Sequence, residues 1–520
     1  MGPSEKRETL TLPKAHPTYD DDRTLERLGK RPRLTRSFGY MSMLGFSCSG
    51  LCSWESIMLS SVPSLLIGGP ASVIWGILFN WIGMASIYFV LAELSSMAPT
   101  NGGQYHWVAM LAPPSWSSFL SYMTAWLTTL AWQAVAATVA YIVATLLQGI
   151  IILANPHYIP APWHTVFLIW AVGLVVAMLN SMNNRYLAKL ESLILILHLA
   201  GFFGIIIPMV YLAPHNDASF VFTTIFNNGG WPTQGIAFMI SLPGMTAPLI
   251  GADCAVHMSE EIQSAAIIVP KAIVSTVFIN GVLAFAAAIA LLFCIEDIEA
   301  AVAAVETVFY PCLYVFQTVT NSITGACLMG GLIFILAVAG MVSLCATTSP
   351  MLWSFSRDNG LPFSIFIVKL TSNSIPVAAI YTTLGITMLL ALISLGSAVA
   401  LQALLSLMTG ALLSSYILPC SLLLWRRCVG EIQPYYPDGL QTGLAWGPWK
   451  LPGLFGTINN IYACLYGVLI FFWSFWPTAV NPTAETFNWS ILVYVVVILF
   501  SVVWWIVRAR HYFEGPIKEV

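Results

Sequence analysis

The sequence predicts an all-α polytopic membrane protein with about twelve transmembrane helices. Of its 520 residues, 58% are hydrophobic and only 8% carry a charge, whereas about 25% are charged in soluble domains. Apolar stretches of about twenty residues, the length that crosses the hydrocarbon core of a bilayer, recur along the whole chain. No soluble core could bury this much apolar surface, so the chain must lie in a membrane.

Each predicted span is an apolar stretch bounded by charged, proline-rich or glycine-rich residues. The first five spans lead to a polar connection near residue 213, and five more lead to an arginine pair at the end of the tenth. The last two spans follow a long loop. In order, we place the spans at 41–65, 71–92, 117–148, 164–182, 190–212, 233–257, 270–294, 323–349, 376–396, 400–425, 457–476 and 489–508.

The remaining segments are predicted to lie outside the bilayer. Residues 1–37 mix charges with proline and predict a disordered cytoplasmic tail. The proline-rich segment 426–456 predicts a cytoplasmic loop between the ten-span core, 38–425, and the last two spans, 457–508. Residues 509–520 form a short cytoplasmic tail. The stretch QYHWVAML, within a segment too polar to span, predicts a short helix against the inner face.

The distribution of charge predicts the orientation of the chain. With both termini cytoplasmic, all twenty lysine and arginine residues fall on the inner side. The segments assigned outside carry none and instead hold Asp217, Glu296, Asp297, Glu299, Glu306 and Glu485. This asymmetry is what the positive-inside rule requires, and a miscounted span would have scrambled it.

The first span contains LGFSCSGLCSWE, in which weak helix formers lead to a carboxylate, Glu55. The sixth span contains ISLPGMTAPLIGAD, with two prolines and two glycines before Asp253. Proline removes a backbone donor and clashes with the preceding turn, so this helix is expected to break. Small residues within a span can also serve close helix packing alone. The coincidence at positions one and six favours broken helices, which in transporters built from inverted repeats flank the substrate.

Three further stretches carry a family resemblance. They are AELSSMAPTNGGQYHWVAMLAPP (92–114), ADCAVHMSEEIQSAAIIVPKA (252–272) and SFSRDNGLPFS (354–364). With them the chain, from about Phe38 to Ile517, resembles the amino acid–polyamine–organocation superfamily, and within it fungal permeases for choline, 4-aminobutyrate and related amines. Two departures from the usual pattern are Pro350, where an arginine is expected, and Ala247-Pro248, where relatives often have an aromatic residue.

The resemblance implies a 5+5 inverted repeat with helices 1 and 6 broken, plus two peripheral helices. It also implies a secondary active transporter, coupled to protons or sodium, that imports an amino acid or a small amine such as choline or 4-aminobutyrate by alternating access. We expect the plasma membrane as its location, with the vacuolar membrane as the alternative. The expected partners are the substrate, the coupling ion and the bilayer, with no nucleic acid, no metal and no cofactor.

The two breaks define the predicted substrate site. Glu55 either attracts a substrate ammonium or a coupling cation, or holds the break. Asp253 either binds substrate or holds the unwound backbone, and Trp132 either binds a cation on its ring face or packs. Glu93, Glu260 and Glu261 at inner helix ends are expected to brace loops, or to form an inner gate with Arg357 or Lys271. The predicted substrate-binding residues are Ser47, Cys48, Ser49, Gly50, Glu55, Trp132, Ala247, Ile250, Gly251 and Asp253.

His198 is the predicted proton-coupling residue. It lies inside the fifth span, and no ionisable group is nearer in sequence than Glu191. Its unperturbed pKa of about 6.5 allows it to load and release a proton near physiological pH. On the resemblance, its position matches a fifth-helix lysine that proton-coupled relatives place beside the broken first helix. A protonated His198 would bond the carbonyl groups around Gly45 to Ser49, although a buried packing histidine explains the sequence equally well.

An enzyme needs a catalytic motif, and the sequence contains no HExxH, GxSxG or GxxxxGK[ST] pattern. Without a phosphate-binding loop the chain is not expected to be an ATP-driven pump. The alternative from another class is a nutrient sensor that evolved from a permease and binds without translocating. Such sensors tend to carry an enlarged cytoplasmic extension, and the tail here has about forty residues.

Overall fold

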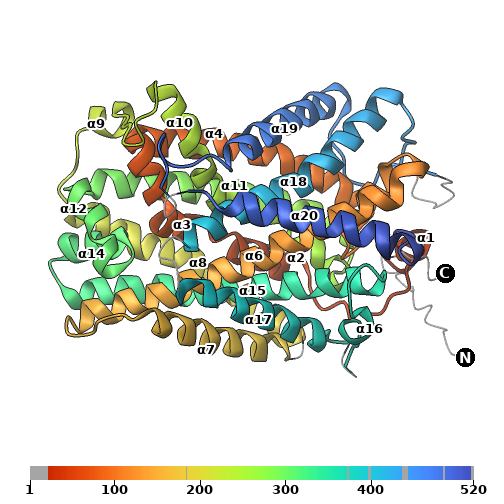
Figure 1. The fold of residues 1–520 in the computed structure, drawn as a ribbon, viewed down its shortest axis with the longest axis horizontal. Helices are drawn as coiled ribbons and strands as arrows, with labels where there is room; N and C mark the ends of the chain where they lie inside the picture. The colour runs from red at the N-terminus through yellow and green to blue at the C-terminus, as the bar shows by residue number, and fades with distance from the viewer. Residues whose placement is uncertain are drawn as a thin grey trace, which may run out of the picture.

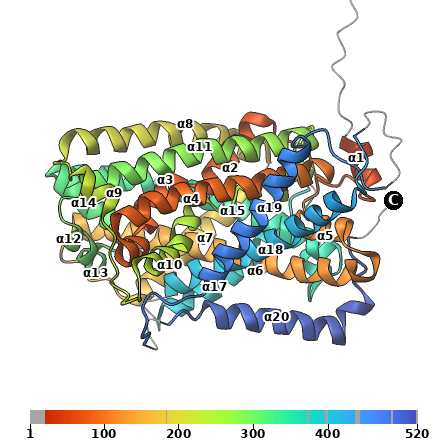
Figure 2. The ribbon, with the colours of Figure 1, turned by 90° about the horizontal axis from the view of Figure 1, so that it is seen from above.

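The computed structural model describes residues 21–182, 184–371, 374–395, 400–435, 443–483 and 487–516. Within these residues the chain forms helices and no strand, and extended backbone pairs only at the isolated bridges Phe38–Ile262 and Gln433–Ala445. The long helices lie side by side in one bundle (Figures 1 and 2). The helix α1 (Asp21–Arg27) and the last turns of α20 (Ser490–Val507) lie at one end of this bundle, called the terminal end below; the opposite end is called the far end.

The first five spans begin with a helix in two pieces. These are α2 (Tyr40–Leu51) and α3 (Ser53–Ser60), separated by Cys52. The four that follow are α4 (Val62–Met97), α6 (Pro114–Ala154), α7 (Pro162–Asn180) and α8 (Asn184–Leu212). The short helix α5 (Gln104–Leu111) covers the predicted QYHWVAML segment and is confirmed as a helix.

The second five spans begin in the same way. The sixth span consists of α10 (Gln234–Thr246) and two 3-10 segments, η1 (Ala247–Leu249) and η2 (Ala252–Glu261). The next are α11 (Ala265–Cys294), α15 (Ile323–Arg357), α17 (Val377–Ala391), which η3 (Leu392–Leu395) extends, and α18 (Ala400–Val429). The last two spans are α19 (Gly453–Trp473) and α20 (Ser490–Val507), which η4 (Ala509–His511) follows.

The predicted fold class is therefore confirmed. Eleven helices among the described residues are long and apolar enough to cross a membrane, and α2 with α3, each too short alone, add the first span. The helices α12 (Ile298–Ala303) and α13 (Val305–Val308) also pair with α14 (Pro311–Thr320) across a bend of 116°. This bent pair lies at the far end beside α9 (Ala218–Thr223) in both views (Figures 1 and 2).

The second span differs from the predicted one in its start. Sequence patterns place it at 71–92, because Gly69 and Pro70 interrupt the apolar stretch, whereas α4 begins at Val62. Gly69 has non-helical dihedral angles (φ 76°, ψ −177°), so α4 consists of two helical pieces joined at a kink, and the piece after Gly69 corresponds to the predicted span. Among the helix contacts, α4 packs against α10 and α11, and α6 packs against α15 and α18. The first piece of the broken first span, α2, packs against α8.

The predicted disordered tail is corrected in its second part. Residues 1–20 lie outside the described residues, but α1 (Asp21–Arg27) and the extended segment after it pack on the terminal end (Figure 2). The Asp21 carboxylate accepts hydrogen bonds from the backbone N–H groups of Ser264 and Ala265, at 2.7 and 3.0 Å, at the start of α11. Composition suggested disorder because it reports charge and proline content, and not the partners that a charged side chain finds in the folded core.

Candidate functional site

The break in the first span is a single residue. α2 stays helical through Leu51, Cys52 takes left-handed dihedral angles (φ 44°, ψ 46°), and α3 begins at Ser53. The predicted break is confirmed, but the glycines before it pack within the helix. A Cβ atom on Gly45 would lie 2.2 Å from the backbone oxygen of Glu191, so only glycine permits α2 and α8 to approach this closely.

The break in the sixth span is longer and also confirmed. Gly251 has a φ of 116°, a conformation that residues with a Cβ rarely adopt, and the chain continues as a 3-10 helix. The N–H groups that the break exposes already have a partner. Gly251 and Ala252 donate to the Tyr88 hydroxyl at 2.7 and 3.2 Å, and Tyr88 in turn donates to the Leu249 carbonyl at 3.1 Å.

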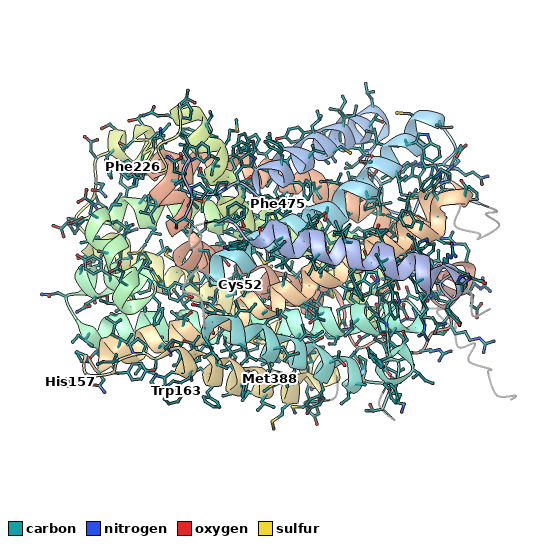
Figure 3. All side chains as sticks on the ribbon, viewed as in Figure 1. Cys52, His157, Trp163, Phe226, Met388 and Phe475 are labelled. Carbon is teal, nitrogen blue, oxygen red and sulfur yellow. The ribbon has the colours of Figure 1, made fainter. Side chains whose placement is uncertain are left out.

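A central cavity lies where the two breaks face each other. Its volume is about 70 Å³. Figure 3 shows Cys52, one of its lining residues, in the interior of the bundle, away from both ends. The wall is mostly apolar, with hydroxyl groups and one carboxylate. The lining residues are Gly50, Leu51, Cys52, Glu55, Ser56, Leu59, Ser60, Val135, Thr138, Val139, Ile142, Ala247, Ile250, Ala337, Gly340, Leu344, Leu405 and Met408.

The carboxylate in this wall belongs to Glu55, in the first turn of α3. Its Oε1 atom lies 2.7 Å from Nδ1 of His198 on α8, and both side chains are buried. Glu55 Oε2 and His198 Nε2 are buried, and neither atom has a hydrogen-bond partner among the described residues. Leaving charged or polar atoms unpaired in a buried site costs free energy, so this pair is poised to receive a further group.

His198 therefore has a partner other than the one expected. The sequence suggested the carbonyl groups before the break, on α2, whereas the imidazole reaches the carboxylate after the break, on α3. Trp54 packs beside the imidazole, with the ring centroids 6.0 Å apart. The structure thus places the predicted coupling residue in direct contact with a predicted substrate residue.

Four of the predicted substrate residues line the central cavity, namely Gly50, Glu55, Ala247 and Ile250. Trp132 lies outside this lining: its indole N–H donates to His257 Nε2 at 3.0 Å, and His257 Nδ1 lies 2.9 Å from the Asn101 carbonyl. The imidazole must then accept at Nε2 and donate at Nδ1, which fixes the neutral tautomer.

The other predicted residues lie one layer further toward the terminal end or within helix contacts. Asp253 accepts from the Tyr416 hydroxyl at 2.5 Å and from the Gln104 amide at 2.6 Å, so it joins η2 to α18 and α5. The Ser49 hydroxyl donates to Glu191 Oε2, and the Cys48 Sγ atom lies 3.9 Å from Oγ1 of Thr276 on α11. Ser47 and Gly251 are outside the cavity lining as well.

Sequence reasoning missed two residues at this site, Tyr88 and Glu191. Tyr88 is an ordinary apolar-span tyrosine in the sequence, and nothing near it indicates that it meets the sixth span. Glu191 offered a signal: it is a carboxylate within an apolar span, two turns before His198 and on the same helix face. Its side chain is fully buried and bonded to Ser49 and Ser343.

The terminal end of the bundle is closed by buried ion pairs. The Arg357 guanidinium binds both carboxylate oxygens of Glu260 at 3.0 Å each, the inner-gate pairing that the sequence suggested. Lys30, from the segment after α1, lies 2.6 Å from Asp358, and both side chains are buried. Burial lowers the pKa of the Lys30 ammonium, while the Asp358 carboxylate opposes that shift.

A second cavity leads from the centre toward the far end. Its volume is about 40 Å³, and it shares Ser60, Ala247 and Leu405 with the central cavity. Its lining extends to Trp476 and Thr478, in the connection after α19. Buried ion pairs thus lie at the terminal end, and the two adjoining cavities lie between the centre and the far end.

Comparison with known proteins agrees with this architecture. A family model described as amino acid permease matches residues 38–498. The chain is 30% identical to a choline transporter of Saccharomyces cerevisiae over 93% of this chain and 83% of that protein. It is 26% identical to amino-acid permease 2 of Neurospora crassa over 99% and 93% of the two chains, and 27% identical to amino-acid permease BAT1 of Arabidopsis thaliana over 95% and 96%. The chain therefore belongs to the amino acid permease family, whose members are membrane transporters and not enzymes.

Proposed function

We propose that the protein is a secondary active transporter that imports a small cationic amine across the plasma membrane by alternating access, coupled to protons. One observation carries the proposal: the buried Glu55 carboxylate lies between the two helix breaks, in the wall of the central cavity, with one oxygen unpaired. The positive charge of a substrate amine would offset the charge of this carboxylate.

The donors near the cavity favour an amine without an adjacent carboxylate. A zwitterionic amino acid would need N–H groups for its carboxylate, which helix breaks can offer. Here Gly251 and Ala252 donate to Tyr88, and the Ser53 N–H lies 3.4 Å from the Asn280 side-chain oxygen. A substrate carboxylate would also lie near Glu55. Choline carries a positive charge and no carboxylate, as the proposed site requires, and it is the substrate that the name of the yeast relative states.

The orientation and the coupling are part of the same proposal. The basic residues gather toward the terminal end, which supports cytoplasmic termini by the positive-inside rule. With this end closed by Glu260–Arg357 and Lys30–Asp358, the cavity faces the outside. His198 remains the proposed proton-coupling residue, because it can bind a proton while it holds Glu55.

Uptake of radiolabelled choline by intact cells that express the chain tests the proposal. Glu55→Gln removes the charge that offsets the ammonium, so we expect the Michaelis constant for choline to rise by about tenfold or more, the factor that corresponds to about 1.4 kcal/mol. The matched control is Glu296→Gln, which removes an exposed carboxylate at the far end and should leave the constant unchanged.

Two results would contradict the proposal. In the first, Glu55→Gln transports choline with the wild-type Michaelis constant at equal surface expression. In the second, the wild type binds choline but accumulates none, which would make the protein a sensor. Glycine betaine, a quaternary ammonium that carries a carboxylate, is the discriminating competitor and is expected to inhibit uptake weakly.

A further inference from the structure

Three buried side chains from three different spans form a closed ring of oxygen contacts. Glu191 of α8 lies between Ser49 of α2 and Ser343 of α15. The Ser49 hydroxyl is 3.0 Å from Glu191 Oε2, the Ser343 hydroxyl is 2.9 Å from Glu191 Oε1, and the two hydroxyls are 2.7 Å apart. All three distances are those of oxygen pairs that share a proton.

The ring requires more protons than its two hydroxyl groups contain. Each serine hydroxyl donates once, and an ionised carboxylate only accepts. Three contacts therefore need a third proton, which the carboxyl group of Glu191 must carry. Each hydroxyl can also donate to a carbonyl of its own helix: Ser49 Oγ lies 3.1 Å from Phe46 O, and Ser343 Oγ lies 3.3 Å from Ala339 O. If either does so, the ring lacks a further proton.

The surroundings offer no charge that would favour an ionised carboxylate. Among the described residues no basic side chain forms an ion pair with Glu191, and the titratable groups that face it are the thiols of Cys52 and Cys254. The Glu191 side chain is fully buried, so bulk solvent does not reach its carboxyl group. A buried carboxyl group without a counter-charge favours its neutral form.

We propose that Glu191 is a proton-binding site, in addition to His198, and that the ring closes only when its carboxyl group is protonated. The proton then acts as a ligand for the state in which α2 is bound to α8 and α15. This inference rests on the proposed transport function for its role, but the protonation itself does not depend on transport.

A small cavity lies on the terminal side of the ring, about one helical turn from it. Its volume is about 20 Å³, and it is lined by Leu187, one turn from Glu191 along α8, and by Ala346, about one turn from Ser343 along α15. A cavity of this size can hold one water molecule. Movement of α2 away from α15 would break the ring beside this cavity, so that the carboxyl group would release its proton toward the terminal end.

Infrared difference spectroscopy of the purified full-length protein tests the protonation directly. We expect a protonated carboxylic-acid carbonyl band at neutral pH that is absent in Glu191→Gln. Glutamine keeps the fold because its amide can donate to one serine and accept from the other. Ser343→Ala removes two of the three contacts, so its band should appear only at lower pH. The control is Ser415→Ala, a buried serine of α18 whose hydroxyl donates to Leu412 O, which should leave the band unchanged.

Transport then tests the coupling. With the acidic group removed, Glu191→Gln is expected to lose stimulation of choline uptake by an inward proton gradient while it retains exchange of internal for external choline. His198→Gln alone should leave the infrared band intact. The inference is overturned if wild type and Glu191→Gln have the same carboxylic-acid band, or if Glu191→Gln keeps the wild-type gradient dependence. A wild type that transports no amine, yet shows the band, would instead contradict the proposed function.

Discussion

A buried histidine at the terminal end makes the stability of the protein depend on pH. Burial lowers the pKa of His106, on α5, to about 3, and the nearby Lys30 ammonium acts in the same direction. The folded state therefore holds the imidazole neutral, while the unfolded chain takes up a proton below pH of about 6.5. Because the unfolded state binds more protons there, stability falls as the pH is lowered from about 6.5 toward 3.

We expect this single group to remove about 1.4 kcal/mol of unfolding free energy for each pH unit below 6.5. Between neutral pH and a pH of about 5, the free energy of unfolding of His106→Asn is therefore expected to fall by about 2 kcal/mol less than that of the wild type. Thermal unfolding in detergent as a function of pH measures the difference. His157→Asn, an exposed histidine at the far end, is the control and should follow the wild-type curve. Equal pH profiles for all three proteins would show that His106 is not held neutral.

At the scale of elements, the two breaks make the site. Gly50 and Gly251 are the positions where a large side chain is expected to stop transport. In α2, Gly50 faces Cys254, since a Cβ atom there would lie 3.3 Å from Sγ, and its surface also lines the central cavity. Gly251 has open space around it but a positive φ that leucine rarely adopts.

We expect Gly50→Leu and Gly251→Leu each to abolish choline uptake while surface expression is retained. The first fills the cavity, and the second strains the break that positions Tyr88. Gly385→Leu is the control, because a Cβ atom there would have no neighbour within 4 Å and α17 lies away from the cavity. Normal transport by both test variants would place the substrate elsewhere.

The contrast between the breaks and their partners shows what a sequence can predict. Prolines and glycines act on their own helix, so ISLPGMTAPLIGAD predicts a break wherever the helix lies in the bundle. The contacts of Tyr88 and Glu191 depend instead on which spans are neighbours and on which face each helix turns to its neighbour. A span that is apolar on all sides has no hydrophobic periodicity from which its buried face could be predicted. His198 illustrates both cases: the sequence marked it as unusual, but its contact with Glu55 required the fold.

At the scale of the whole molecule, closure of the terminal end depends on a segment that the sequence predicted to be disordered. Lys30 reaches the end of α15 and pairs with Asp358, which also accepts from the Tyr105 hydroxyl at 2.8 Å. Loss of the Lys30 ammonium would take one counter-charge from the buried Asp358 carboxylate, and removal of one partner from a buried ion pair costs about 3–5 kcal/mol. In a state open at the terminal end, water would solvate the Asp358 carboxylate, so loss of Lys30 would destabilise that state less than the closed one.

We therefore expect Lys30→Met to lower the thermal stability and to shift the population toward the state open at the terminal end, which raises the Michaelis constant for external choline. Asp358→Asn in the same background removes the buried negative charge that Lys30 balanced and should restore part of both properties. The control is Lys369→Met, an exposed lysine at the same end. An unchanged Michaelis constant and melting temperature in Lys30→Met would show that the pair does not hold the closed state.

The last turn of α15 is held from both ends of the chain. Lys30, in the N-terminal segment, forms an ion pair with Asp358. Phe513, buried near the C-terminus, packs on Phe355 with the ring centroids 6.0 Å apart. Segments near both ends of the chain therefore contact the same turn. A fluorescent protein or a surface tether fused at either end would be expected to disturb this turn and the ion pairs beside it, so neither fusion site leaves the closed terminal end unaffected.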